Sequence, residues 1–120
     1  MGKGAFVTVE NKGTALAKVY QGGDNCMNAT GNWGNLIPAG KDSAREYIEA
    51  HASGIPCCCE ASTIIYGIAT LNPETGGFTQ VGTFSLREDD NVWSSSGATG
   101  PITVNCTPGE QYTITVTYNN

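Results

Sequence analysis

Two-residue alternation near the end of the sequence is the feature that most constrains the fold. In "QYTITVTY", aromatic and aliphatic side chains alternate with threonines over residues 112–118. Successive side chains of a β-strand point to opposite faces, so this stretch predicts a half-buried antiparallel strand. We expect it in the interior of a sheet, with Ile114 and Val116 in the core.

Further strand candidates recur at short intervals along the chain. They cover residues 5–10, 15–21, 62–71, 78–88 and 100–106. Gly, Asn and Pro separate them, and no long linker or repeat of 20–50 residues divides the chain. This pattern predicts an all-β antiparallel sandwich or barrel. We take the sandwich as the prediction, as a single domain over residues 1–120.

The segment 43–52 fits two structures. Ser43 and Glu46 match a capping box, and apolar side chains follow at helical spacing, which predicts a short helix. The stretch "SAREYIEA" also alternates with a period of two, which predicts a strand. Local chemistry leaves both structures open.

Composition excludes several classes of partner. Charged residues make up 14% of the 120 residues, and six Lys and Arg against eleven Asp and Glu give a net charge of −5. An acidic chain lacks the basic surface that binds DNA or RNA. Anionic lipid is disfavoured for the same reason, so a lipid partner would be neutral or zwitterionic. We expect no transmembrane segment, because the apolar runs are too short.

The first ten residues lack the apolar stretch of a signal peptide. We therefore expect either export by another route, to the cell surface or the extracellular space, or a cytoplasmic protein.

An enzyme is not expected, because the chain has one histidine, His51, and none of the common catalytic motifs. No cofactor is predicted.

Five cysteines are the candidates for cross-links: Cys26, Cys57, Cys58, Cys59 and Cys106. Adjacent cysteines point to opposite sides of a strand, so the triplet is a poor template for zinc and no metal is predicted. Two disulfides from the triplet to Cys26 and Cys106 are feasible, although a reduced, buried set is the alternative. An odd count leaves at least one thiol free or bonded to another molecule.

Both tryptophans lie in loop-like sequence, Trp33 in "TGNWGNL" and Trp93 in "DDNVWSSSG". Flat rings at loop tips suit a lipid headgroup or the face of a sugar, and the alternative is a ring folded back onto the core. Neighbouring amides would supply hydrogen bonds to either ligand. The predicted ligand-binding residues are Asn32, Trp33, Asn35, Asn91 and Trp93.

The first half of the chain resembles a known group of proteins. "VTVEN", "ALAKVYQGG" and "GNWGNLIPAGKDSAREYIEAHASGIP" look like the aegerolysin and actinoporin-like β-sandwich cytolysins. The resemblance implies a lipid-binding sandwich whose aromatic loops engage sphingolipid or phosphocholine-type headgroups, and it makes "SAREYIEA" a strand. The chain lacks the amphipathic N-terminal helix of actinoporins, which favours a binding component over a pore former.

Three functions follow from these features. The first is a non-enzymatic module that recognises zwitterionic lipid headgroups, in the manner of a cytolysin. The second is a glycan-binding lectin. The third is a structural subunit that forms homo-oligomers through cysteines or unpaired edge strands.

Overall fold

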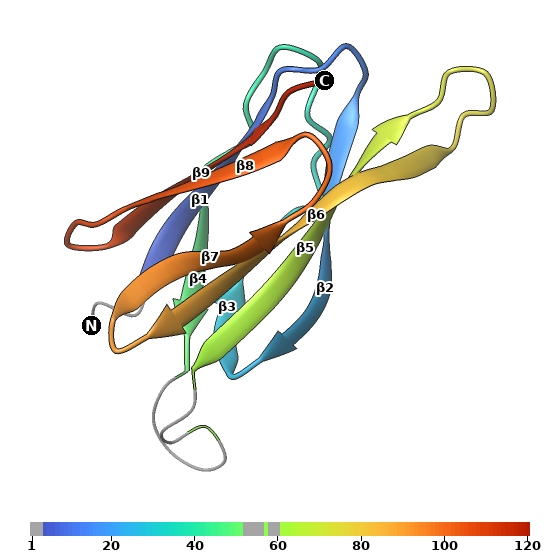
Figure 1. Ribbon diagram of the computed structural model, residues 1–120. Coiled ribbons are helices and arrows are strands. Elements are labelled where there is room, and N and C mark those ends of the chain that lie inside the picture. Colours follow the sequence, from blue (N-terminus) through green and yellow to red (C-terminus); the bar gives the residue numbers. More distant parts are fainter. Residues whose placement is uncertain (1–3, 52–56, 58–60) are drawn as a thin grey trace.

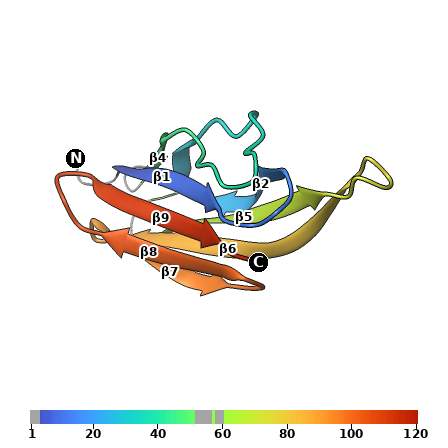
Figure 2. The ribbon, with the colours of Figure 1, turned by 90° about the horizontal axis from the view of Figure 1, so that it is seen from above.

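The protein is a β-sandwich of two sheets, seen in a computed structural model (Figure 1, Figure 2). The structure describes residues 4–51, 57 and 61–120. Within these residues the strands are β1 (Gly4–Asn11), β2 (Ala17–Asn25), β3 (Met27–Thr30), β4 (Glu46–Ala50), β5 (Ser62–Leu71), β6 (Phe78–Asp89), β7 (Val92–Ala98), β8 (Ile102–Thr107) and β9 (Tyr112–Tyr118).

The first sheet has the order β3-β4-β1-β9-β8, and the second has the order β2-β5-β6-β7. The described pairs are antiparallel except β1 and β9, which run parallel from Ala5 opposite Tyr112 to Asn11 opposite Tyr118. The all-β sandwich is therefore confirmed, with one parallel pair that local alternation does not reveal.

The core lies between the two sheets and follows the alternation of the strands. Ile114 and Val116 of β9 are fully buried, as predicted, and β9 lies inside its sheet between β1 and β8. The second sheet contributes Tyr66 and Phe84, whose rings stack with centroids 5.2 Å apart. Burial of such side chains is the main favourable term in folding.

Of the two structures expected within residues 43–52, the strand is present and the short helix is not, because residues 46–50 are strand β4. Ile48 is paired with Ala5 of β1 and is fully buried, so the strand places an apolar side chain in the core. Both capping-box side chains serve other partners. Ser43 Oγ accepts a hydrogen bond from Val9 N at 2.9 Å, and Glu46 Oε1 accepts one from Asn32 N at 2.8 Å.

Candidate functional site

Asn32, Trp33 and Asn35 come together in the connection between β3 and β4. Two backbone hydrogen bonds tie this connection to the edge of the second sheet, Ala17 N to Ile37 O at 2.9 Å and Ile37 N to Ala17 O at 2.8 Å. The connection therefore runs beside β2. We call residues 31–37 the Trp33 loop.

Trp33 is half-buried, and its orientation is fixed. Its indole Nε1 donates a hydrogen bond to Thr30 O at 2.9 Å, and its ring meets the ring of Tyr66 edge-on, with centroids 5.6 Å apart. Tyr66 OH donates to the same carbonyl at 2.8 Å, and burial raises the pKa of this phenol. The ring is thus a fixed wall of the loop and not a free tip.

Gly31 makes the orientation of Trp33 possible. Its φ is +86°, a left-handed conformation that favours glycine. A Cβ at this position would lie 2.6 Å from Trp33 Nε1, which is closer than real Cβ atoms approach. The glycine is required both by the turn and by the packed indole.

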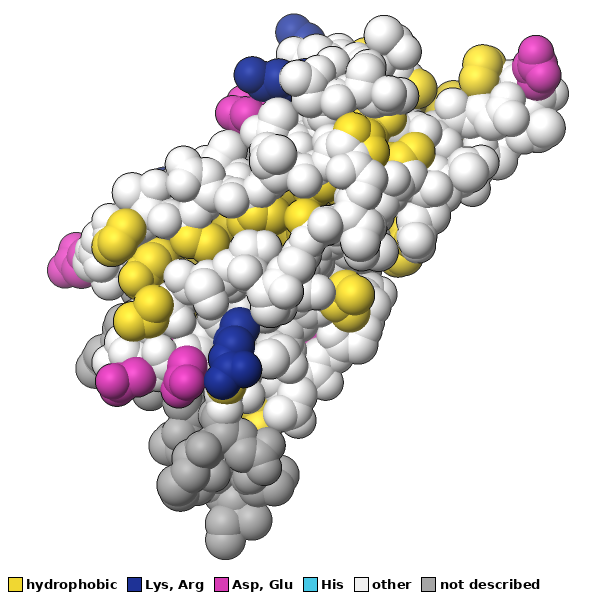
Figure 3. Space-filling view, in the orientation of Figure 1, with side chains coloured by type: hydrophobic (Ala, Val, Ile, Leu, Met, Phe, Trp, Pro, Cys, Tyr) yellow, Lys and Arg dark blue, Asp and Glu magenta, His cyan; other side chains and the backbone are white. Residues whose placement is uncertain are grey.

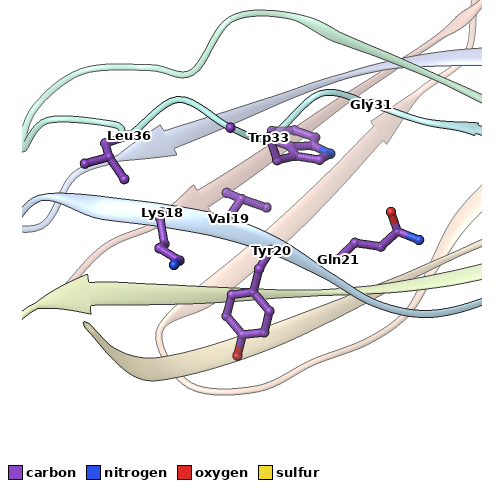
Figure 4. A pocket seen from close by; sticks show the side chains of 8 residues that line it. Lys18, Val19, Tyr20, Gln21, Gly31, Trp33 and Leu36 are labelled. Atoms are coloured by element: carbon purple, nitrogen blue, oxygen red, sulfur yellow. The ribbon is translucent and has the colours of Figure 1, made fainter. Parts of the chain in front are cut away.

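A pocket of about 400 Å³ lies between β2 and the Trp33 loop. It is lined by Lys18, Val19, Tyr20, Gln21, Gly31, Trp33, Gly34 and Leu36. Figure 4 shows Trp33 and Leu36 on the loop side, with Val19 directed toward them, and Lys18 and Tyr20 on the other side of β2. The pocket therefore wraps around the edge of the strand.

The edge of β2 supplies backbone groups to this pocket. The N–H and C=O of Ala17 both point away from β5 and toward Ile37. Since this direction alternates along an antiparallel strand, the N–H and C=O groups of Val19 and Gln21 also point away from β5. β2 is the first strand of its sheet, and within the described residues no strand pairs with this side beyond Ala17. Two N–H donors thus face the pocket.

The rim combines a cation with an exposed apolar side chain. Leu36 is 47% exposed, and Lys18 Nζ lies 5.1 Å from the centroid of the Phe78 ring. Two more lysines, Lys12 and Lys41, lie in turns at this end of the molecule. The backbone N–H of Asn11 donates to Lys41 O, and that of Lys12 donates to Tyr118 O. Figure 3 shows basic side chains at the upper end of the molecule, where these turns lie.

A smaller pocket of about 60 Å³ lies beside the Trp33 loop as well. Its polar lining consists of Asn32, Asn35, Asp42, Ser43 and Glu46. Asn32 is held there, since its Oδ1 accepts Gly34 N at 3.4 Å while its own N–H binds Glu46. Two of the three predicted amides, Asn32 and Asn35, therefore line this smaller pocket, while Trp33 lines both pockets.

The expected loop position of Trp93 is wrong. Trp93 lies in β7 opposite Glu88 and is 2% exposed, because β7 pairs with β6 and turns the indole into the core. Glu88 is also buried, and its Oε2 accepts Asn91 N at 2.8 Å. Asn91 is exposed in the β6–β7 turn, away from the Trp33 loop (Figure 1). The second half of the predicted site therefore does not join the first.

One of the two considered disulfides is present. Cys26, at the corner between β2 and β3, is bonded to Cys57, with their Cα atoms 5.6 Å apart. Cys106 in β8 carries a free thiol, and burial raises its pKa. Cys58 and Cys59 lie outside the described residues.

Sequence reasoning missed Lys18, Tyr20 and Leu36. The signal for the first two is the alternation of "AKVYQ", which places them opposite the buried Ala17 and Val19. Leu36 in the Asn- and Gly-rich loop is a large apolar residue without a core partner.

Comparison with protein-family models and with curated proteins finds no match for this chain. Among the described residues, no helix is long and apolar enough to cross a bilayer. The same residues contain no group of three or more His, Cys, Asp or Glu side chains suited to holding a metal ion.

Proposed function

We propose that the protein is a non-enzymatic recognition module for zwitterionic lipid headgroups, which bind across the edge of β2 beside the Trp33 loop. The observation that carries the proposal is the lining of the larger pocket. One cation, Lys18, two aromatic rings, Tyr20 and Trp33, and the exposed Leu36 line this pocket from the two sides of β2. The resemblance to the aegerolysin and actinoporin-like group predicts the same ligand class.

Each part of a phosphocholine-type headgroup has a matching group. The phosphate would accept hydrogen bonds from Lys18 and from the edge N–H groups of Val19 and Gln21, which are strongest when the acceptor is charged. The quaternary ammonium would lie against an aromatic side chain through a cation–π contact. Leu36 would enter the apolar boundary of the bilayer, where an interfacial aliphatic side chain is favourable.

The remaining features agree with an exported binding protein. The net charge of −5 disfavours anionic membranes, while the lysines beside the Trp33 loop offset that charge locally. The Cys26–Cys57 disulfide is of a kind that persists in oxidising compartments, which supports a cell-surface or extracellular location.

Sedimentation with lipid vesicles tests the proposal. We expect binding to phosphatidylcholine or sphingomyelin vesicles and weaker binding to phosphatidylglycerol vesicles. Leu36→Asn should weaken vesicle binding by about fivefold, because burying half a leucine contributes on the order of 1 kcal/mol. Val92→Asn is the matched control, since Val92 is 53% exposed in the second sheet, away from the Trp33 loop.

Lys18→Ala should reduce binding to phosphatidylcholine vesicles and leave the melting temperature unchanged. The proposal fails if the wild-type protein sediments with neither zwitterionic lipid. It also fails if Leu36→Asn and Lys18→Ala bind as well as Val92→Asn does.

A homo-oligomer is the second candidate, and the seam between β7 and β8 favours it. Each is an edge strand of its sheet, and Figure 3 shows a line of apolar side chains between them. Cys106, with its free thiol, lies in β8. A second copy of the chain would cover this seam and bring two Cys106 thiols together. Non-reducing electrophoresis tests it: a dimer band lost in Cys106→Ser supports the oligomer, and a monomer band alone contradicts it.

A further inference from the structure

The outer face of the second sheet carries a hollow that the Trp33 loop does not touch. Its volume is about 380 Å³, within the range of small-molecule sites. All four strands of the sheet contribute to its lining, which consists of Gly23, Asp24, Asn25, Thr63, Ile64, Ile65, Ser85 and Ser96.

Two β-bulges flank this hollow. In β2 the register shifts between Gln21 and Asp24, where the chain reads Gly22-Gly23. In β7 the register shifts opposite Ser85 and Leu86, which leaves Ser96 as the extra residue. Bulges bend a strand and re-aim its side chains, and they are frequent beside functional sites.

The glycines of the first bulge keep the hollow open. A Cβ on Gly22 would lie 2.7 Å from Ile65 Cγ2, whereas a Cβ on Gly23 would meet nothing within 4 Å. Ile65 can therefore lie flat against the backbone of Gly22 and still remain 36% exposed. It gives the hollow one apolar surface.

The rest of the lining is rich in hydrogen-bonding groups. Within the described residues, the hydroxyls of Thr63, Ser85 and Ser96 have no hydrogen-bond partner in the protein. Asp24 uses Oδ2 to accept a hydrogen bond from Gln21 Nε2 at 2.6 Å, which holds the carboxylate at the rim. Hydroxyls both donate and accept, and a carboxylate accepts from two neighbouring donors.

We infer that this hollow is a binding site for a neutral saccharide. A pyranose offers adjacent hydroxyls, which pair with the carboxylate and the three side-chain hydroxyls, and it offers C–H groups, which pack on Ile65. A negatively charged ligand is disfavoured by Asp24. A metal ion is disfavoured because the lining has a single carboxylate.

The inference is independent of the proposed lipid site. Lys18, Tyr20 and Trp33 line the first pocket and do not line this one. The two linings share no residue, although Gln21 of the first donates a hydrogen bond to Asp24 of the second. Because no residue is common to the two linings, vesicle binding and saccharide binding can fail separately.

A glycan array probed with the labelled full-length chain tests the inference first. We expect retention on at least one uncharged glycan. Titration of ¹⁵N-labelled protein with the methyl glycoside of the terminal sugar should then shift the backbone amides of residues 23–25, 63–65, 85 and 96, and leave those of the Trp33 loop in place.

Two variants make the test specific. Asp24→Asn and Ser96→Ala should each weaken binding of that methyl glycoside by about tenfold, the usual effect of losing a hydrogen bond to a charged or desolvated group. Glu74→Gln is the control, because it makes the same change from carboxylate to amide at an exposed position in the β5–β6 turn. Binding to no neutral glycan, shifts confined to residues 31–37, or unchanged affinity in both variants would each overturn the inference.

Discussion

Trp33 and Tyr66 both donate a hydrogen bond to the carbonyl of Thr30, and their rings meet edge-on at 65°. The contact joins the Trp33 loop to the centre of β5, so the loop takes its position from the core. A binding pocket built on this contact is preformed, which lowers the entropy cost of binding.

Gly31→Ala should disturb this arrangement. The change places a Cβ 2.6 Å from Trp33 Nε1 at a φ of +86°, so we expect a loss of at least about 1 kcal/mol of stability and a shifted Trp33 indole resonance in the NMR spectrum. Gly34→Ala is the control, since its Cβ would meet only Asn32 Oδ1 at an ordinary 3.5 Å. Equal melting temperatures for the two variants would contradict the account.

The core prediction concerns Ile114, which is fully buried in β9. Ile114→Ala should lower the free energy of unfolding by about 2–5 kcal/mol, because it removes buried methyl groups and leaves a cavity. Thr113→Ala, on the exposed side of the same strand, should stay within about 0.5 kcal/mol of the wild type. Urea denaturation followed by circular dichroism measures both.

The Cys26–Cys57 disulfide closes a loop with a sequence separation of 31. Cys26→Ser should cost about 3–4 kcal/mol, the loss of loop-closure entropy in the unfolded chain. Reductant should destabilise the wild type by a similar amount and have little further effect on Cys26→Ser. Cys106→Ser, which removes a free thiol, should be close to wild type; a larger loss there than in Cys26→Ser would reverse the assignment.

The pair Tyr47 and Glu49 makes stability depend on pH. Tyr47 OH donates to Glu49 Oε1 at 2.6 Å, and this hydrogen bond raises the pKa of Tyr47 from 10.0 to about 12. Because the pKa of Tyr47 is raised in the folded protein, its hydrogen bond contributes fully to stability below pH 10. This stabilisation is lost as the pH rises toward 12. The same hydrogen bond is the largest cause that lowers the pKa of Glu49, and the hydrogen bond from Asn28 is the second. The stabilisation by the ionised Glu49 is therefore lost in acid as the pH falls below 4.5.

Tyr47→Phe should therefore be less stable than the wild type between about pH 5 and 9, by no more than about 1 kcal/mol, because the pair is only partly buried and solvent screens it. The difference should shrink above pH 10 and below about pH 4. Thermal unfolding across this range measures it, and a constant difference at every pH would show that the hydrogen bond is not its source.

The strands could be predicted where one side of the strand faces the core and the other faces water. This holds for residues 112–118, whose alternation matches the burial of β9. Residues 43–52 were ambiguous because Ser43 and Glu46 suit a helix N-terminus equally well. Their partners, Val9 and Asn32, lie far away in sequence, and only the folded sheet brings them into contact.

The candidate site could be predicted only in part, for a similar reason. Trp93 precedes "SSSGA", which is typical of a loop, yet pairing with β6 keeps this stretch in the sheet. Lys18 and Tyr20 join the pocket because the Ala17–Ile37 bridge carries the Trp33 loop alongside β2. No local pattern contains that long-range contact.

The parallel pairing of β1 with β9 has a consequence for synthesis of the chain. Glu10 accepts a hydrogen bond from Thr117 across a sequence separation of 107. At roughly 5–20 residues per second, a ribosome needs about 5–20 seconds to deliver the second partner after the first. During that time β1 has an open side at the centre of the future sheet, and such edges pair readily with other chains. Until β9 has been synthesised, this side of β1 therefore stays open to pairing with other chains.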